Sequence, residues 1–170
     1  ELFTGDEVTF VSALIQAGFE SDFPLAVESS CDLIDSSISI PSFTVILAQF
    51  IPNLVQYITS EIPEVSFSSF NTISLILEYE ESHNESTLEE LWGIKESVAL
   101  DKVETYLHCL QNCIRKTPQL ETDFINTVFE FIAQFITEPI EDIEIASSCL
   151  SIISAVISRE ETQAERDRKS

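Results

Sequence analysis

The sequence FINTVFEFIAQFI (residues 124–136), followed by TEP (137–139) and IEIASSCL (143–150), shows most clearly how this chain folds. In its first segment Phe124, Val128, Phe131 and Phe135 recur every three to four positions, which is the spacing of one face of an α-helix. Pro139 fits the first turn of a following helix, because a proline there loses no hydrogen bond. The stretch therefore predicts two helices joined by a short turn.

The same helical spacing runs through nearly the whole chain, and the alternation typical of strands is almost absent, so we expect an all-α fold. Thr4 and Glu7 fit a capping box at the first helix, and Gly18 is expected to stop it. Pro52 must kink or split the third helix, because it lacks the backbone N–H that a helix interior requires. The predicted helices span residues 6–17, 23–36, 41–59, 63–82, 87–98, 101–115, 120–136 and 141–159.

The helices repeat as pairs with a period near forty residues. Cys31, Phe70, Cys109 and Cys149 occupy equivalent positions in alternate helices, at intervals of 39, 39 and 40 residues. Such a period predicts a stack of two-helix repeats, in which each hairpin covers the apolar face of its neighbour. The hairpins are residues 6–37, 41–82, 86–117 and 120–159, which form one domain, with a polar segment at 160–170 that extends the last helix or forms a disordered tail. An irregular bundle of eight helices is the alternative.

These hairpins resemble HEAT and armadillo repeats, with residues 124–150 as the best match and Pro52 similar to the break between the first two helices of an armadillo unit. The resemblance covers roughly residues 6–159 and implies a right-handed α-solenoid that binds proteins. Trp92 is followed four residues later by Glu96 rather than Asn, so the peptide-binding ladder of importin-α type is absent. The acidity and the degenerate repeats are similar to segments of importin-β-type transport receptors, exportins included.

The charge of the chain is strongly acidic. It holds 30 Asp and Glu against 8 Lys and Arg, a formal net charge of −22, and no basic residue precedes Lys95, while sixteen acidic residues do. Nucleic acids and anionic membranes require patches of Lys and Arg, so we expect neither as a partner. With 44% hydrophobic residues the chain can still bury a sizeable core. We expect a protein partner that is a basic or amphipathic helix or peptide.

The sequence also suggests where the protein resides. It contains no run of eighteen apolar residues and no signal-peptide pattern. Its four cysteines are too few for a disulfide framework in a chain of this length, which favours a reducing, intracellular setting, cytoplasmic or nuclear or both. The chain contains no Met, so we expect it to be a segment of a longer protein.

The candidate partner-binding residues come from three features. The resemblance implies that the second helix of each hairpin lines a concave face. The acidic candidates on those helices are Glu28, Asp32, Glu104 and Glu144. Trp92 is either a core residue or an interface hot spot. A dense acidic stretch can hold a basic peptide, or is simply a solvated turn; it lacks the Asp/Asn and Gly spacing of a calcium loop. The stretch contains Glu78, Glu80, Glu81, Glu85, Glu89 and Glu90, of which Glu78 and Glu81 are the binding candidates.

The cysteines are better explained as core residues than as ligands or nucleophiles. Cys109 and Cys113 share a helix face next to His108, but a structural zinc site needs four ligands and no second pair is evident. A catalytic thiol needs a basic neighbourhood, and this chain supplies the reverse. We expect no metal, no cofactor and no disulfide between Cys31 and Cys149.

The expected function is that of a non-catalytic protein-binding scaffold. Net charge would steer a basic partner segment, and apolar anchors would then bury between successive second helices. The alternative is a structural segment of a larger transport receptor or complex subunit that docks neighbouring repeats or self-associates. A helical enzyme with a carboxylate-bound metal would require paired Glu-x-x-His sequences, which are absent, as are nucleotide-binding and hydrolase motifs.

Overall fold

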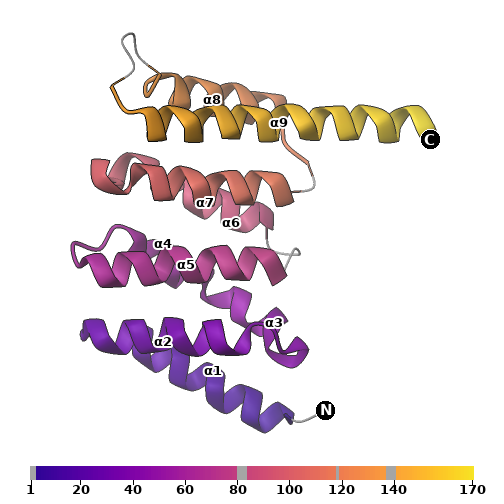
Figure 1. The fold of residues 1–170 in the computed structure, drawn as a ribbon. Coiled ribbons are helices and arrows are strands. Elements are labelled where there is room, and N and C mark those ends of the chain that lie inside the picture. The colour runs from indigo at the N-terminus through magenta and orange to yellow at the C-terminus, as the bar shows by residue number, and fades with distance from the viewer. Residues whose placement is uncertain (1–2, 80–83, 118, 137–140) are drawn as a thin grey trace. The chain divides into compact units, whose positions relative to one another are not determined.

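The computed structural model describes residues 3–79, 84–117, 119–136 and 141–170, and every regular element in these residues is helical (Figure 1). The predicted all-α class is confirmed. The chain forms two compact units, Glu1–Val98 and Ala99–Ser170, within the stretch that the sequence analysis took as one domain. No helix formed by the described residues has the length and hydropathy that crossing a membrane requires.

The first unit contains two long helical hairpins. Its elements are α1 (Gly5–Phe19), α2 (Pro24–Ser37), α3 (Pro41–Leu47), the 3₁₀ turn η1 (Ala48–Phe50), α4 (Ile51–Ile58), α5 (Pro63–Tyr79), α6 (Asn84–Gly93) and η2 (Lys95–Ser97). Helix α2 packs against both α1 and α5, and α5 also packs against α4. Figure 1 shows α2 and α5 side by side and running in the same direction. The core of the unit contains the fully buried side chains of Ile15, Ile34, Leu54, Ile58, Ile73 and Ile76.

The predicted break at Pro52 is confirmed. Where one helix was expected over residues 41–59, the structure has α3, the 3₁₀ turn η1 and then α4, with Pro52 at the second position of α4. The missing N–H of a proline is harmless in a first turn, which is why the new helix begins there. The rings of Phe19, Phe50 and Tyr57 pack together, and the Tyr57 hydroxyl donates a hydrogen bond to the Phe19 carbonyl.

The start of α1 follows the sequence prediction, and its end does not. The Thr4 N–H donates a hydrogen bond to Glu7 Oε2 at 2.6 Å, as a capping box requires. Gly18, the predicted stop, lies inside the last turn, and the helix continues to Phe19. A Cβ on Gly18 would lie 1.9 Å from Ser30 Oγ and 2.8 Å from the Ala26 carbonyl oxygen. Gly18 therefore lets α2 approach α1 closely; it does not terminate the helix.

A polar contact lies in the interface between α2 and α5. Thr72 Oγ1 donates a hydrogen bond to Asp35 Oδ1 at 2.8 Å, and Thr72 is fully buried. Burial raises the pKa of the Asp35 carboxyl above its usual value of 3.8, and the Thr72 hydrogen bond only partly opposes this shift. The contact fixes the register of the two helices.

The second unit consists of η3 (Leu100–Lys102), α7 (Val103–Lys116), α8 (Thr122–Ala133) and α9 (Ile143–Lys169). Helix α9 packs mainly against α7 and also touches α8. Asp142 caps α9, since its Oδ1 accepts hydrogen bonds from the N–H groups of Glu144 and Ile145 at 3.0 Å each. Thr137 and Pro139, in the turn that the sequence predicts before this helix, lie outside the described residues.

Helix α9 continues ten residues beyond Arg159, through the predicted polar tail. No Gly or Pro interrupts this segment, and its last turn carries Arg166, Arg168 and Lys169, which interact favourably with the helix dipole. Arg159 itself is half-buried, and its Nη1 donates a hydrogen bond of 2.6 Å to the Ile114 carbonyl near the end of α7. Arg159 thereby satisfies an end carbonyl of a neighbouring helix.

Candidate partner-binding surface

The acidic candidates of the first unit lie on two neighbouring helices. Asp32 on α2 and Glu78 in the last turn of α5 are exposed, whereas Glu28 on α2 is half-buried. Taking the contact between Asp35 and Thr72 as the register, Glu28 and Glu78 are separated by about 20 Å along the parallel helices. The structure therefore spreads these acids along the unit. Glu81, together with Glu80, lies outside the described residues.

The second unit brings two predicted residues together. Glu104 on α7 and Glu144 on α9 are both exposed and lie side by side. The charge of Glu144 is the main cause that raises the pKa of Glu104 above its usual value of 4.5, followed by desolvation, a side-chain hydrogen bond with Glu144 and the charge of Asp142. His108 acts weakly in the opposite direction. Two carboxylates held this close repel each other and attract a cation.

The shifted carboxyl gives a direct prediction. In an NMR titration the side-chain carboxyl of Glu104 should have a midpoint above 4.5, and Glu144→Gln should move that midpoint down towards 4.5. Asp142→Asn should move it less, because the charge of Asp142 contributes less. Equal midpoints in the wild type and Glu144→Gln would show that the two carboxylates do not interact.

The described residues contain no group of three or more His, Cys, Asp or Glu side chains placed to hold a metal ion. Cys109 and Cys113 lie on the buried face of α7, while the neighbouring His108 is exposed. The two thiols and the imidazole therefore point to different environments and do not converge.

All four cysteines carry thiols that form no disulfide, and all four are buried. Burial raises the pKa of Cys31 and of Cys149 to about 11 and that of Cys113 to about 12. Since the thiolate is the reacting form, a thiol of pKa 11 should react about 100-fold more slowly near pH 8 than one at the usual value of 9, before any steric protection. A thiol reagent should therefore modify the native protein slowly, and all four sites rapidly in denaturant. Fast native modification of Cys31 would mean that the interface between α2 and α5 opens.

Trp92, on α6, is half-buried. This burial is intermediate between that of a core residue and that of an exposed interface residue, the two alternatives that the sequence left open. Lys95 Nζ lies 4.7 Å from the centre of the Trp92 ring, and it donates a 3.5 Å hydrogen bond to the Trp92 carbonyl. This is a cation–π contact between neighbouring turns. Lys95 thus holds one face of the indole ring by an intramolecular contact.

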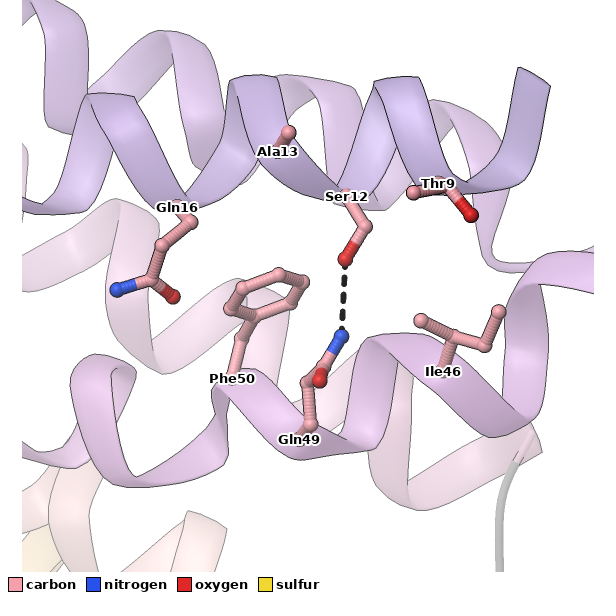
Figure 2. A pocket seen from close by; sticks show the side chains of 7 residues that line it. All are labelled: Thr9, Ser12, Ala13, Gln16, Ile46, Gln49 and Phe50. Atoms are coloured by element: carbon pink, nitrogen blue, oxygen red, sulfur yellow. Dashed lines mark hydrogen bonds between the residues drawn. The ribbon is translucent and has the colours of Figure 1, made fainter. Parts of the chain in front are cut away.

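Sequence reasoning missed a groove in the first unit, between α1 and the segment formed by α3 and η1 (Figure 2). Its volume is about 430 Å³, and no charged side chain lines it. Gln49 Nε2 donates a hydrogen bond of 2.9 Å to Ser12 Oγ across the groove, and the ring of Phe50 points towards α1. The groove depends on how α1 packs against α3 and η1. A local sequence pattern does not specify that packing. The groove is lined by Thr9, Ser12, Ala13, Gln16, Ile46, Gln49 and Phe50.

Comparison with known proteins gives no further assignment. The sequence matches no family model, and neither the curated proteins nor the solved structures give a significant match.

Proposed function

We propose that this chain is a non-catalytic, protein-binding helical-repeat scaffold whose acidic surface binds a basic or amphipathic segment of a partner protein inside the cell. The observation that carries the proposal is the exposed pair Glu104 and Glu144, whose mutual repulsion raises the pKa of Glu104. A Lys or Arg side chain bound between these carboxylates relieves the repulsion. The absence of any basic residue before Lys95 extends the attraction over much of the chain.

The arrangement of the second helices supports a repeat scaffold. Glu104 and Glu144 are forty residues apart, as are the buried Cys109 and Cys149, which is the spacing that the proposed repeat requires. Helices α7 and α9 pack directly against each other, and so do α2 and α5. This is the packing that stacked HEAT or armadillo repeats use, and a right-handed solenoid of that type is part of the proposal.

A second candidate function is that of a structural segment that docks neighbouring repeats of a larger transport receptor or complex subunit. Helix α1 favours it, because Phe10 and Leu14, one turn apart, are 64% and 48% exposed. In a repeat array such a face is covered by the preceding hairpin.

The proposed function is tested by the binding of a fluorescently labelled, Lys- and Arg-rich amphipathic peptide at about 50 mM and about 500 mM salt. We expect salt-sensitive binding that Glu104→Gln with Glu144→Gln weakens about 5-fold, the effect of losing two exposed charge contacts.

The matched control removes the same charge elsewhere in the unit. Glu121→Gln with Glu130→Gln, both exposed and next to or on α8, should change the affinity less than about 2-fold. Equal losses in the two double variants would mean that only net charge matters. A peptide affinity that changes neither with salt nor with the substitution of Glu104 and Glu144 would refute the acidic surface and favour apolar docking.

A further inference from the structure

The groove between α1 and the segment formed by α3 and η1 is uncharged inside and has an acid beyond each end (Figure 2). Its residues on α1 recur every three to four positions, so they follow one side of the helix. The same spacing reaches Asp6, three positions before Thr9, and Glu20, four positions after Gln16. The hydrogen bond of 2.8 Å from Gln16 Nε2 to Glu20 Oε1 shows that these two side chains share that side. Asp6 and Glu20 therefore stand about 21 Å apart along one line of α1.

Exposed apolar side chains flank the groove on both sides. Phe10 precedes the groove residue Ala13 by one turn of α1, and Leu14 follows Phe10 by one turn. Phe10 and Leu14 are 64% and 48% exposed. On the opposite side, Val45 precedes the groove residue Gln49 by four positions and is 61% exposed. A molecule lying over the groove can thus bury apolar surface against both of its rims.

The shape of the groove fits one side of a third helix. Helices pack by laying rows of side chains into the grooves of their neighbours. A volume of about 430 Å³ holds a few side chains but not a helix, whose diameter is about 10–12 Å, so the partner's backbone would lie above the rims. Both walls are helices, whose backbone groups are paired internally, so they offer no edge to which an extended strand could add.

The charges require uncharged residues at the centre of that helix and basic residues at its ends. A charge sent into the uncharged groove would lose water without gaining an opposite charge. Glu20 caps the C-terminal end of α1, whose last turn contains no basic residue, so the negative end of the helix dipole adds to its charge. Sixteen acidic residues and no basic one precede Lys95. A Lys or Arg of the partner is therefore attracted at both ends of the groove, and an acid is repelled.

We propose that this groove binds one amphipathic helix of a partner protein, which places apolar and neutral polar side chains between the rims and a Lys or Arg beside each of Asp6 and Glu20. The hydrogen bond between Gln49 and Ser12 joins the two walls, so the groove is formed before the partner arrives. The inference goes beyond the proposed function, because it assigns a second site, in the first unit. It rests on the proposed function only for the sign of the partner's charge.

The first test maps binding on the whole isotope-labelled chain by NMR. The probe is a synthetic helix of about 18 residues with Lys at both ends and Leu and Ala between them. We expect shift changes at the amides of Thr9, Ala13 and Gln49. The same peptide with Glu in place of Lys should bind at least about 10-fold more weakly. Changes confined to α7 and α9 would overturn the groove while supporting the acid pair of the proposed function. No change at all on α1 would likewise overturn it and leave Phe10 and Leu14 to a flanking repeat.

The second test removes the apolar rim. Phe10→Ser with Leu14→Ser should weaken binding of the Lys-ended peptide by about 10-fold or more, because two apolar contacts are lost. Phe67→Ser, at a 56% exposed position of α5 in the same unit, should change the affinity less than about 2-fold. Circular dichroism checks that the variants remain folded. Unchanged affinity in the double variant refutes the proposed mode of binding. A chain that dimerises alone, and no longer does so in this double variant, assigns the groove to a second copy instead.

The third test removes the end charges. Asp6→Asn with Glu20→Gln should weaken the same peptide about 5-fold at about 50 mM salt and less at about 500 mM. An amide oxygen at position 20 can still accept the Gln16 hydrogen bond, so the wall is kept. The matched control is Glu61→Gln with Glu64→Gln, two exposed acids of the same unit, and equal losses in both pairs would show that only net charge acts.

A last variant separates this inference from the proposed function. Glu104→Gln with Glu144→Gln should leave the shift changes on α1 in place, because these two residues belong to the second unit. Loss of the α1 changes in that variant would mean that the peptide binds at the acid pair, which overturns the groove alone.

Discussion

Gly18→Ala is expected to lower the free energy of unfolding by about 1–3 kcal/mol, although alanine is the better helix former. The added methyl group would lie 1.9 Å from Ser30 Oγ and 2.8 Å from the Ala26 carbonyl oxygen. Helices α1 and α2 must therefore separate, which also strains the 2.9 Å hydrogen bond from Ser30 Oγ to the Ile15 carbonyl. Urea unfolding followed by circular dichroism measures the loss.

Two further variants make this prediction sharp. Gly93→Ala should be neutral or stabilise by up to about 1 kcal/mol, because nothing lies within 4 Å of a Cβ at that position. Adding Ser30→Ala to Gly18→Ala removes the hydroxyl but leaves the Ala26 carbonyl, so the recovery should be only partial. Similar stabilities for Gly18→Ala and Gly93→Ala would contradict the close approach of the two helices.

Ile73→Ala should destabilise the protein by about 2–5 kcal/mol, the range for emptying a well-packed site of this size. Ile73 is fully buried on α5, the helix that packs against both α2 and α4. Because α5 contacts both neighbours, it cannot move towards one of them to close the cavity without losing contacts with the other. Chemical unfolding monitored by tryptophan fluorescence and by circular dichroism measures this loss.

The matched control lies on the same helix. Phe67→Ala removes a larger side chain, but Phe67 is 56% exposed, so its cost should be below about 1 kcal/mol. If Phe67→Ala costs as much as Ile73→Ala, Phe67 is covered in solution and the exposed face of α5 is an interface.

The elements that could be predicted are those whose cause lies within a few residues. Apolar spacing predicted the helices, and Pro52 predicted the break between α3 and α4 because its missing N–H acts locally. Gly18 was misassigned as a stop because its role depends on Ser30, twelve residues away on another helix. The length of α9 was left open because a polar helical extension and a polar tail have the same composition.

The features of the candidate surface also differ in whether their cause is local or long-range in the sequence. Glu104 and Glu144 were selected individually, and their proximity follows from the packing of α7 against α9, which joins residues about forty positions apart. The half-burial of Glu28 depends on the neighbours of α2, which helical spacing alone does not specify. No sequence pattern indicates the groove beside Gln49, because the groove lies between α1 and the segment formed by α3 and η1, which are far apart in the sequence.

The burial of the Asp35 carboxyl between α2 and α5 couples folding to proton uptake. The Asp35 carboxyl has its usual pKa of 3.8 when unfolded and a higher pKa when folded, so between these two values the folded chain binds more protons. Stability should therefore rise as the pH falls through the folded pKa towards 3.8, and the cost of the buried charge is fully present above that window. Urea midpoints at about pH 5 and about pH 7.5, for wild type and Asp35→Asn, measure this coupling. The proton that Asp35 gains on folding also removes one negative charge from a chain of net charge −22, and so reduces its self-repulsion.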